Sequence, residues 1–203
     1  MSEIYHANDA AIDGELSFLL ECDKMKSILR RTMLADYSRR ENDAEHSWHL
    51  ALTILTLAPH MKQKFDMGHA LSMACVHDLV EIYAGDTFAY DEKGYEDKLE
   101  REEAAARKLF AMLPEAQGEE FYRLWKEFDE METTESRLAN AADRIQPFLN
   151  NLATYGHTWR LGDVKKSQVL KRMAPVWEAL PDLRDFMFGA IDDAVSRGWL
   201  AEG

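Results

Sequence analysis

The sequence contains few cysteines, and this limits the kind of protein that it can encode. Only two are present, Cys22 and Cys75, which argues against a disulfide framework and excludes a zinc site built from several cysteines. Cys75 lies in an apolar run, and we expect it to be a buried free thiol. Because the first residues also lack a basic start and an apolar signal segment, we expect a cytoplasmic protein.

Long apolar runs are lacking as well. The longest stretch, Leu50–Ala58, is about nine residues long and includes two threonines. A helix needs about twice that length to cross a bilayer. The sequence therefore predicts a protein that does not insert into a membrane.

Basic residues are scarce relative to acidic ones. There are 24 Lys and Arg against 37 Asp and Glu, and the net charge is −13 with neutral histidines. A surface that binds nucleic-acid polymers or anionic membranes in general needs an excess of Lys and Arg, so we expect neither kind of partner. A small phosphorylated ligand is still allowed, because it needs only a local basic patch or a metal ion.

Proline and glycine are also infrequent, with 5 and 10 residues among 203. Apolar residues recur at spacings of three and four, and no run of alternating β-branched residues is present, so the sequence predicts an all-α fold. Asp43 and Asp66 are expected N-caps, and Gly85 is an expected C-terminal glycine. The expected helices span 13–30, 43–58, 66–83, 95–113, 116–131, 134–156, 165–178 and 182–198.

The length fits one domain, and no Ser-, Gly- or Pro-rich linker divides the chain. We therefore expect residues 1–203 to form a single-domain helical bundle. The hydrophobic content of 46% is enough for a core of ordinary size.

The segment 70–86 carries the first signs of a functional site. On a continuous helix, His77 and Glu81 share a stripe with the apolar Ala70 and Ala74, and Asp78 lies on the neighbouring stripe. Two carboxylates and an imidazole that face the core are costly unless something compensates them. A divalent cation does so efficiently, because imidazole and carboxylate are ligands of zinc, manganese, iron and cobalt.

His77 and Asp78 point about 100° apart on a helix, so further ligands must come from other helices. His46 lies near the start of the preceding apolar helix, and Asp143 lies on an otherwise apolar helix face. Two histidines and two aspartates would enclose a cation and leave positions open, as a catalytic site requires. The set suits manganese, cobalt, iron, zinc, nickel or magnesium.

Each signal has a simpler structural interpretation when it stands alone. A His-Asp dipeptide is commonly a capped or solvated pair, and a buried histidine such as His46 is commonly a core residue with satisfied hydrogen bonds. His49, three residues after His46, is displaced around the helix, and we interpret it as structural. The combination of the separate signals favours a metal site.

These residues belong to longer motifs. The segment Arg40-Glu41-Asn42-Asp43-Ala44-Glu45-His46-Ser47-Trp48, then His77-Asp78-Leu79-Val80-Glu81-Ile82-Tyr83-Ala84-Gly85-Asp86, then Asp143, resembles the HD-domain metal-dependent phosphohydrolases. Within them it is most similar to the branch of 5′-deoxynucleotidases. The resemblance runs from about 31 to 143. It implies an all-α bundle with a motif core at about 28–157, C-terminal helices at 165–203 that pack on it or at a dimer interface, and commonly a homodimer.

The resemblance also implies roles for individual residues. It implies four metal ligands, His46, His77, Asp78 and Asp143. Glu81 would orient or activate the attacking water, and Asp86 would assist it or contribute to a second, weaker metal position. Arg31, fifteen residues before His46, matches the arginine that grips the substrate phosphate.

Some segments depart from the pattern of the deoxynucleotidase branch. Thr32 and Met33 follow Arg31 where relatives often carry tryptophan or glycine, and no proline follows Asp86. The resemblance therefore implies metal and phosphate chemistry more strongly than selectivity for deoxyribose. Thr87, Phe88 and Tyr90 form either a stacking or lid surface or part of the core packing. Arg39 and Arg40 either bind phosphate or form ion pairs at the surface.

The expected function is metal-dependent removal of phosphate from nucleoside or deoxynucleoside 5′-monophosphates. One alternative is hydrolysis of another phosphoester, such as a cyclic, signalling or triphosphate nucleotide. A second alternative is a regulatory module that binds a metal and a nucleotide without turnover.

Overall fold

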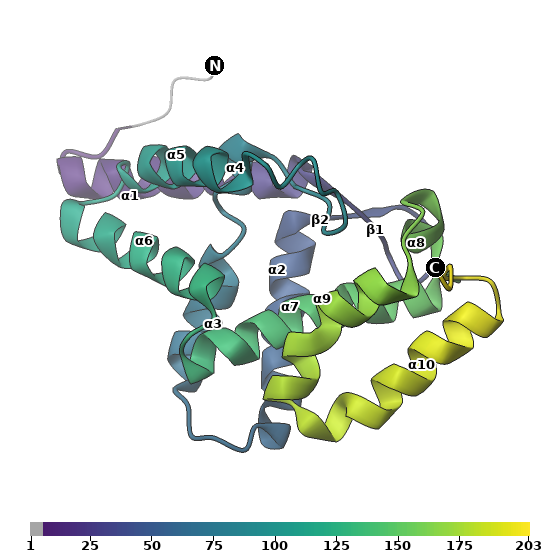
Figure 1. The fold of residues 1–203 in the computed structure, drawn as a ribbon. Coiled ribbons are helices and arrows are strands. Elements are labelled where there is room, and N and C mark those ends of the chain that lie inside the picture. The colour runs from purple at the N-terminus through teal and green to yellow at the C-terminus, as the bar shows by residue number, and fades with distance from the viewer. Residues whose placement is uncertain (1–5) are drawn as a thin grey trace.

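The computed structural model describes residues 6–203, so the expected lack of a signal segment falls on residues outside this range. The described residues form ten α-helices, three short 3₁₀ helices and one two-stranded antiparallel sheet (Figure 1). The predicted all-α fold is confirmed. No helix within residues 6–203 combines the length and the apolar character needed to cross a membrane.

The N-terminal part differs from the expected helix at 13–30. Helix α1 (Ala10–Cys22) leads into the 3₁₀ helix η1 (Asp23–Ser27) and then into strand β1 (Leu29–Met33). Strand β1 pairs with strand β2 (Arg40–Asn42), with Leu29 opposite Asn42 and Met33 opposite Arg40. The prediction was wrong after residue 22, because backbone hydrogen bonds to a segment ten residues away take the place of helical ones.

The N-cap of helix α2 (Asp43–Leu57) lies one residue before the expected Asp43. The Asn42 side chain accepts from the Glu45 amide at 2.9 Å, and the Glu45 carboxylate accepts from the Asn42 amide at 3.2 Å. This capping box makes Asn42 the N-cap, so the expectation that Asp43 caps the helix was wrong. The Asp43 side chain is instead fully buried.

The predicted helix at 66–83 is interrupted in the middle. Helix α3 (Met67–Val76) follows the 3₁₀ helix η2 (Ala58–His60). Asp66 precedes it, and its predicted role as N-cap is confirmed. Residues 77–80 then form turns, and helix α4 (Glu81–Ala84) ends at Gly85 with φ +77°, as predicted. The amides of Leu79, Glu81, Ile82 and Tyr83 bond three residues back, which winds the chain more tightly than an α-helix.

The remaining helices lie close to their expected positions. They are α5 (Lys98–Phe110), α6 (Glu115–Glu130), α7 (Thr134–Ala153), α8 (His157–Leu161), α9 (Lys166–Ala179), the 3₁₀ helix η3 (Pro181–Leu183) and α10 (Arg184–Ser196). The short α8 was not predicted. It arises because Gly156 adopts φ +65° and ends the preceding helical run.

Helix α7 runs through the middle of the fold and contacts α2, α3, α6 and α9 (Figure 1). Its buried Leu138 and Ile145 join Leu50 of α2, Met73 of α3 and Met173 of α9 in the core. Figure 1 shows α9 and α10 at the other end of the molecule from α1, α5 and α6. The long central helix therefore carries its side chains into contact with elements from both ends of the chain.

Cys75 is exposed, so its expected burial was wrong. The buried positions of α3 are Ala70, Met73, Ala74 and Val76. Cys75 occurs in an apolar run but lies on the outward side of the helix, which sequence composition does not reveal.

Gly156 has no room for a side chain. A Cβ at this position would collide with the main-chain oxygen of Trp199, and its positive φ strains any other residue. We expect Gly156→Ala to lower the free energy of unfolding by about 2–3 kcal/mol in urea denaturation. Gly189 lies inside α10 with open space around it, so the control Gly189→Ala should be neutral or stabilising by up to about 1 kcal/mol. Equal stability of Gly156→Ala and the natural chain would contradict the interpretation.

Candidate metal centre

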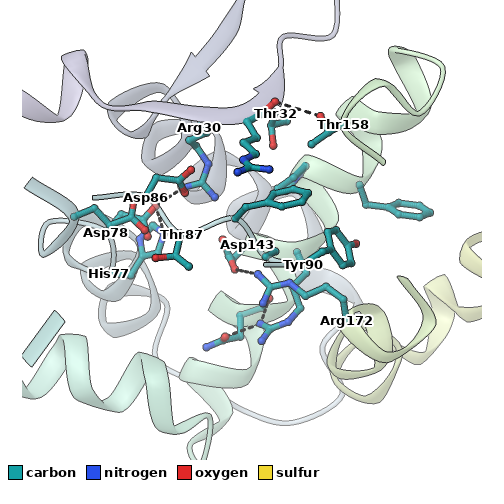
Figure 2. A pocket seen from close by; sticks show the side chains of 18 of the residues that line it. Arg30, Thr32, His77, Asp78, Asp86, Thr87, Tyr90, Asp143, Thr158 and Arg172 are labelled. Atoms are coloured by element: carbon teal, nitrogen blue, oxygen red, sulfur yellow. Dashed lines mark hydrogen bonds and ion pairs between the residues drawn. The ribbon is translucent and has the colours of Figure 1, made fainter. Parts of the chain in front are cut away.

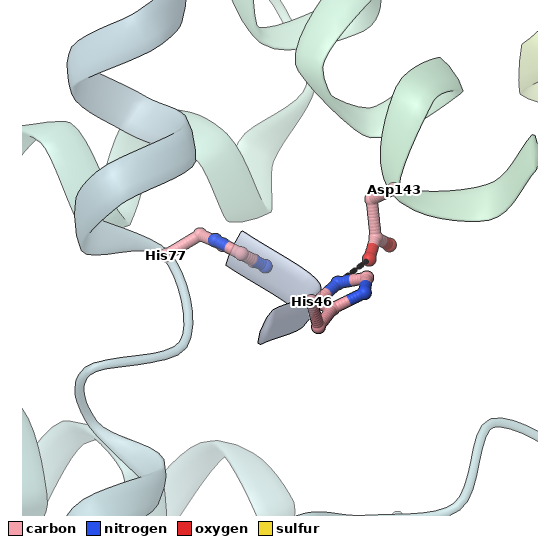
Figure 3. Close-up of side chains that lie close together, drawn as sticks. All are labelled: His46, His77 and Asp143. Atoms are coloured by element: carbon pink, nitrogen blue, oxygen red, sulfur yellow. Dashed lines mark hydrogen bonds and ion pairs between the residues drawn. The ribbon is translucent and has the colours of Figure 1, made fainter. Parts of the chain in front are cut away.

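The side chains of His46, His77 and Asp143 meet in the interior. They come from α2, from the end of α3 and from α7, and one ligand atom of each lies within 4.8 Å of the others. His46 Nε2 lies 3.0 Å from Asp143 Oδ1. Figure 3 shows the His77 ring directed toward this pair. The three side chains are at most 11% exposed.

Asp78 completes the group from the turn after α3. Its Oδ2 lies 3.0 Å from His77 Nε2 and 3.7 Å from His46 Nε2. Residues 77–80 are not helical in the way we expected, yet the tight turn keeps His77 and Asp78 beside each other. The structure thus brings together all four predicted metal ligands.

A hydrogen bond from Nδ1 holds each imidazole ring in place. His77 Nδ1 donates to the main-chain oxygen of Ala74 at 3.0 Å, and His46 Nδ1 donates to Gln146 Oε1 at 2.9 Å. The Gln146 amide nitrogen donates to Glu41 Oε1 at 2.8 Å, which fixes which end of the amide faces His46. Both histidines therefore direct Nε2 toward the carboxylates, as metal-ligating histidines do.

These residues fit a divalent cation. His77 Nε2 is buried and has no hydrogen-bond partner among the described residues, although a carboxylate lies beside it. Two imidazoles and two carboxylates supply nitrogen and oxygen donors of the kind that zinc, manganese, iron and cobalt bind. His46, His77, Asp78 and Asp143 would hold such an ion.

A second acidic group lies next to this one. Ligand atoms of Asp43, Glu81 and Asp86 fall within 4.8 Å of one another. Arg30, from strand β1, compensates part of the charge, because its Nη1 lies 2.8 Å from Asp78 Oδ2, 3.5 Å from Asp43 and 4.0 Å from Asp86. Figure 2 shows Arg30 extending toward Asp78 and Asp86.

Burial and neighbouring charges shift the pKa values of the carboxyl groups in opposite directions. Burial and the adjacent Asp78 raise the pKa of Glu81 well above its usual range, and burial raises the pKa of Asp43 to about 7. Burial also opposes ionisation of Asp78, but His77 and Arg30 outweigh it and hold the pKa of Asp78 low. The site therefore contains carboxyl groups that stay ionised beside a carboxyl group, Glu81, that binds a proton readily.

A cavity of about 320 Å³ opens from the acidic groups toward α7, α8 and α9 (Figure 2). Its volume lies at the lower end of the range for small-molecule sites. Residues 87–90 form part of the wall, and Phe88 and Tyr90 both face the cavity and pack against the core. Phe88 and Tyr90 therefore pack against the core, and a ligand surface at the same residues stays a prediction.

The predicted arginines occupy different environments. Arg31 lines the cavity, and its guanidinium lies 4.6 Å from the centre of the Phe88 ring. Arg39 pairs with Glu45 at the surface, and the Arg40 guanidinium bonds to the main-chain oxygens of Leu29 and Arg30. Arg39 and Arg40 do not line the cavity, so these contacts match their interpretation as surface or structural residues.

Several residues of the site carried no clear sequence signal. They are Arg30, Glu41, Asp43, Gln146 and Arg172. Arg30 adjoins the predicted Arg31, and the alternation of side chains along a strand would have separated the two had β1 been predicted. Gln146 lies three residues after Asp143 on α7, so helical spacing is the one signal that could have placed it on the same face.

Comparisons with known proteins agree with this geometry. A model of the HD-domain family matches residues 22–184, more than half of the chain. The chain belongs to the HD-domain family. This membership confirms the resemblance to the HD-domain family found in the motifs.

Individual relatives add detail. A structure described as a predicted metal-dependent phosphohydrolase from Magnetospirillum magnetotacticum is 43% identical, covers 95% of this chain and 96% of its own, and gives a TM-score of 0.90. A conserved hypothetical protein from Pyrococcus furiosus shares the fold at 23% identity, with a TM-score of 0.58 over 86% of this chain and 98% of its own.

Curated relatives are more distant. The 5′-deoxynucleotidase HDDC2 of Homo sapiens is 25% identical over 135 residues, which are 66% of this chain and 65% of that protein. The Dictyostelium discoideum protein of the same name is 27% identical over 141 residues, 66% of this chain and 74% of its own. The chain thus spans slightly less than two thirds of the length of the human relative that it matches.

The hydrogen bond from His46 to Gln146 can be tested by substitution. Gln146→Leu removes the acceptor that holds Nδ1–H, so we expect Mn²⁺ affinity to fall about 10- to 100-fold in isothermal titration calorimetry. The control Gln63→Leu changes an exposed glutamine outside the cavity and should bind Mn²⁺ like the natural chain. Unchanged affinity in a folded Gln146→Leu protein would show that Gln146 does not position His46.

Proposed function

We propose that this protein hydrolyses (deoxy)nucleoside 5′-monophosphates to a nucleoside and inorganic phosphate. The observation that carries the proposal is the His46, His77 and Asp143 cluster at one end of a cavity that also contains Glu81 and several arginines. The name of the curated relatives supports the 5′-deoxynucleotidase assignment, and the family membership supports phosphohydrolase chemistry in general.

Within this proposal, His46, His77, Asp78 and Asp143 hold a divalent cation. When bound, such a cation lowers the pKa of a coordinated water and polarises the phosphoryl group. Burial and the adjacent Asp78 raise the pKa of Glu81, so its carboxylate is suited to take a proton from the attacking water. Asp86 lies within reach of Glu81 and assists by hydrogen bonding, or contributes to a second metal position.

The bond changes are those of phosphomonoester hydrolysis. The water oxygen bonds to phosphorus, the bond between phosphorus and the 5′ oxygen breaks, and the nucleoside oxygen takes up a proton. Arg31 lines the cavity beside Phe88, where a guanidinium can stabilise the charge of the phosphate oxygens. Phe88 and Tyr90 offer ring faces to a sugar or base.

A phosphate-release assay tests the substrate class. It would use metal-stripped protein, ribo- and deoxynucleoside 5′-mono-, di- and triphosphates, and cobalt, manganese, magnesium or zinc added one at a time. We expect deoxynucleoside 5′-monophosphates to give nucleoside and phosphate with the highest kcat/KM. Release of pyrophosphate or triphosphate from nucleoside triphosphates, with no turnover of monophosphates, would instead support another phosphoester as substrate.

The same assay separates catalysis from binding. Glu81→Gln should keep the metal content and lose about 100- to 10,000-fold in kcat, because it removes the proton acceptor. The control Glu119→Gln alters an exposed carboxylate on α6 and should retain full activity. Nucleotide binding without turnover by the natural protein under every metal would favour a regulatory module over an enzyme.

We also propose that the protein is a homodimer, as the family resemblance implies. An apolar stripe on α2 supports this, because Trp48, Leu52 and Leu55 are 67%, 43% and 50% exposed at helical spacing. The single-domain organisation over residues 1–203 and the cytoplasmic location stay predictions.

The dimer is tested by light scattering after size-exclusion chromatography. The natural chain should elute with twice the 23.4 kDa mass of one chain, and Trp48→Asp should shift it toward the monomer. Tyr155 is also exposed, at 59%, but lies outside α2, so Tyr155→Asp should leave the mass unchanged. A monomeric natural chain at micromolar concentration would contradict the proposal.

A further inference from the structure

Two guanidinium groups line the cavity on the side of α7 and α9. Arg144 follows Asp143 on α7, and Arg172 lies on α9. The motifs that resemble the HD-domain family give neither residue a role. Their partners differ from those of Arg30 and Lys98 in the same cavity, and this difference points to a ligand.

Arg144 has only neutral partners. Its Nη1 donates to the main-chain oxygen of Asn140 at 2.9 Å and to Asn140 Oδ1 at 2.6 Å. Its Nη2 contacts Met131 Sδ at 3.5 Å, a weak acceptor. Its Nε is buried and has no hydrogen-bond partner, and within residues 6–203 no carboxylate forms an ion pair with it.

Arg172 has one carboxylate partner. Its Nη2 lies 3.3 Å from Asp143 Oδ2, as the dashed line in Figure 2 shows. The other oxygen of Asp143 faces His46 Nε2 at 3.0 Å. Arg172 is therefore separated from the histidine pair by a single carboxylate group, and its side chain is still 27% exposed to the cavity side.

Two other cations of the cavity wall, Arg30 and Lys98, have carboxylates of their own. Arg30 forms ion pairs with Asp43, Asp78 and Asp86, and Lys98 pairs with Glu102 at 3.2 Å. Arg172 pairs only with Asp143, which itself faces the candidate metal ligands, and Arg144 forms no ion pair among the described residues. Neither arginine therefore has a carboxylate partner outside the candidate metal centre.

Burial makes a guanidinium without a carboxylate partner costly, and Arg144 Nε is buried without a hydrogen-bond partner. A guanidinium that is buried without an anion gains free energy when an anion enters. The planar fork of arginine matches the oxygens of a phosphate group in particular.

We propose that Arg144 and Arg172 form an oxyanion site that binds the phosphate group of the substrate and the inorganic phosphate that hydrolysis releases. The inference rests on the proposed function, because it places the phosphate beside Asp143 and the histidine pair. Arg31 would then contact the ligand from β1, across the cavity from α7 and α9. Phosphate would be held from both walls of the cavity.

The proposal is tested by titrating inorganic phosphate into the full-length protein as purified, with calorimetry as the readout and the metal content measured in parallel. Arg144→Gln and Arg172→Gln should each weaken phosphate binding about 10- to 100-fold, as expected for loss of charge-assisted hydrogen bonds. Lys171→Gln is the matched control, because Lys171 is exposed on the same helix and does not line the cavity. It should bind phosphate like the natural chain.

Two conservative variants separate phosphate binding from structure. Arg172→Lys retains a charge beside Asp143 but loses the fork, so metal content should be normal while phosphate binding weakens. Arg144→Lys retains the buried charge and serves the same purpose if Arg144→Gln does not fold. Natural affinity for phosphate in folded variants of both arginines, or no phosphate binding by the natural chain, would overturn the inference.

The phosphate-release assay and this titration test the two proposals separately. Arginine-dependent phosphate binding, together with hydrolysis of a different phosphoester, would refute only the nucleotidase proposal. Hydrolysis of 5′-monophosphates with phosphate binding that does not depend on either arginine would refute only the oxyanion site.

Discussion

The rest of the structure depends on the burial of charged side chains where α2, the end of α3 and α7 meet. Moving carboxylates away from water costs several kcal/mol each unless hydrogen bonds, opposite charges or a cation compensate them. His46, His77 and Asp143 lie within reach of a single ion, and Arg30 compensates the neighbouring acids. The central position of α7 follows from this requirement, because it carries Asp143 and the amide that orients His46.

The cavity wall carries charges of both signs. Asp78 and Asp86 lie beside Arg30, and Arg144 and Arg172 lie on the α7–α9 side with Asp143. The proposed phosphate site is compatible with a net charge of −13, because local arginines and a bound cation would reverse the sign of the charge there. The same overall charge disfavours long nucleic acids, which contact a much wider surface.

Helical periodicity predicted most elements, and it failed where non-local contacts decide the backbone. Strand β1 forms because residues 40–42 pair with it, and the pattern at 13–30 contains no sign of that partner. The helix at 66–83 is interrupted because the chain tightens at 77–80, where His77 and Asp78 turn toward residues of other helices. The N-cap of α2 is Asn42, one residue before the predicted Asp43, and Asp43 is instead a buried member of the acidic group.

The sequence by itself determined the all-α class, the family and the four side chains that come together as a candidate metal site, because these depend on periodicity and on motifs of fixed spacing. Only the tertiary structure decided that Arg30 faces the acids while Arg31 stacks on Phe88, and that Gln146 orients His46. The physical reason is distance along the chain. His46 and Gln146 are 100 residues apart, and their contact exists only once α2 packs against α7.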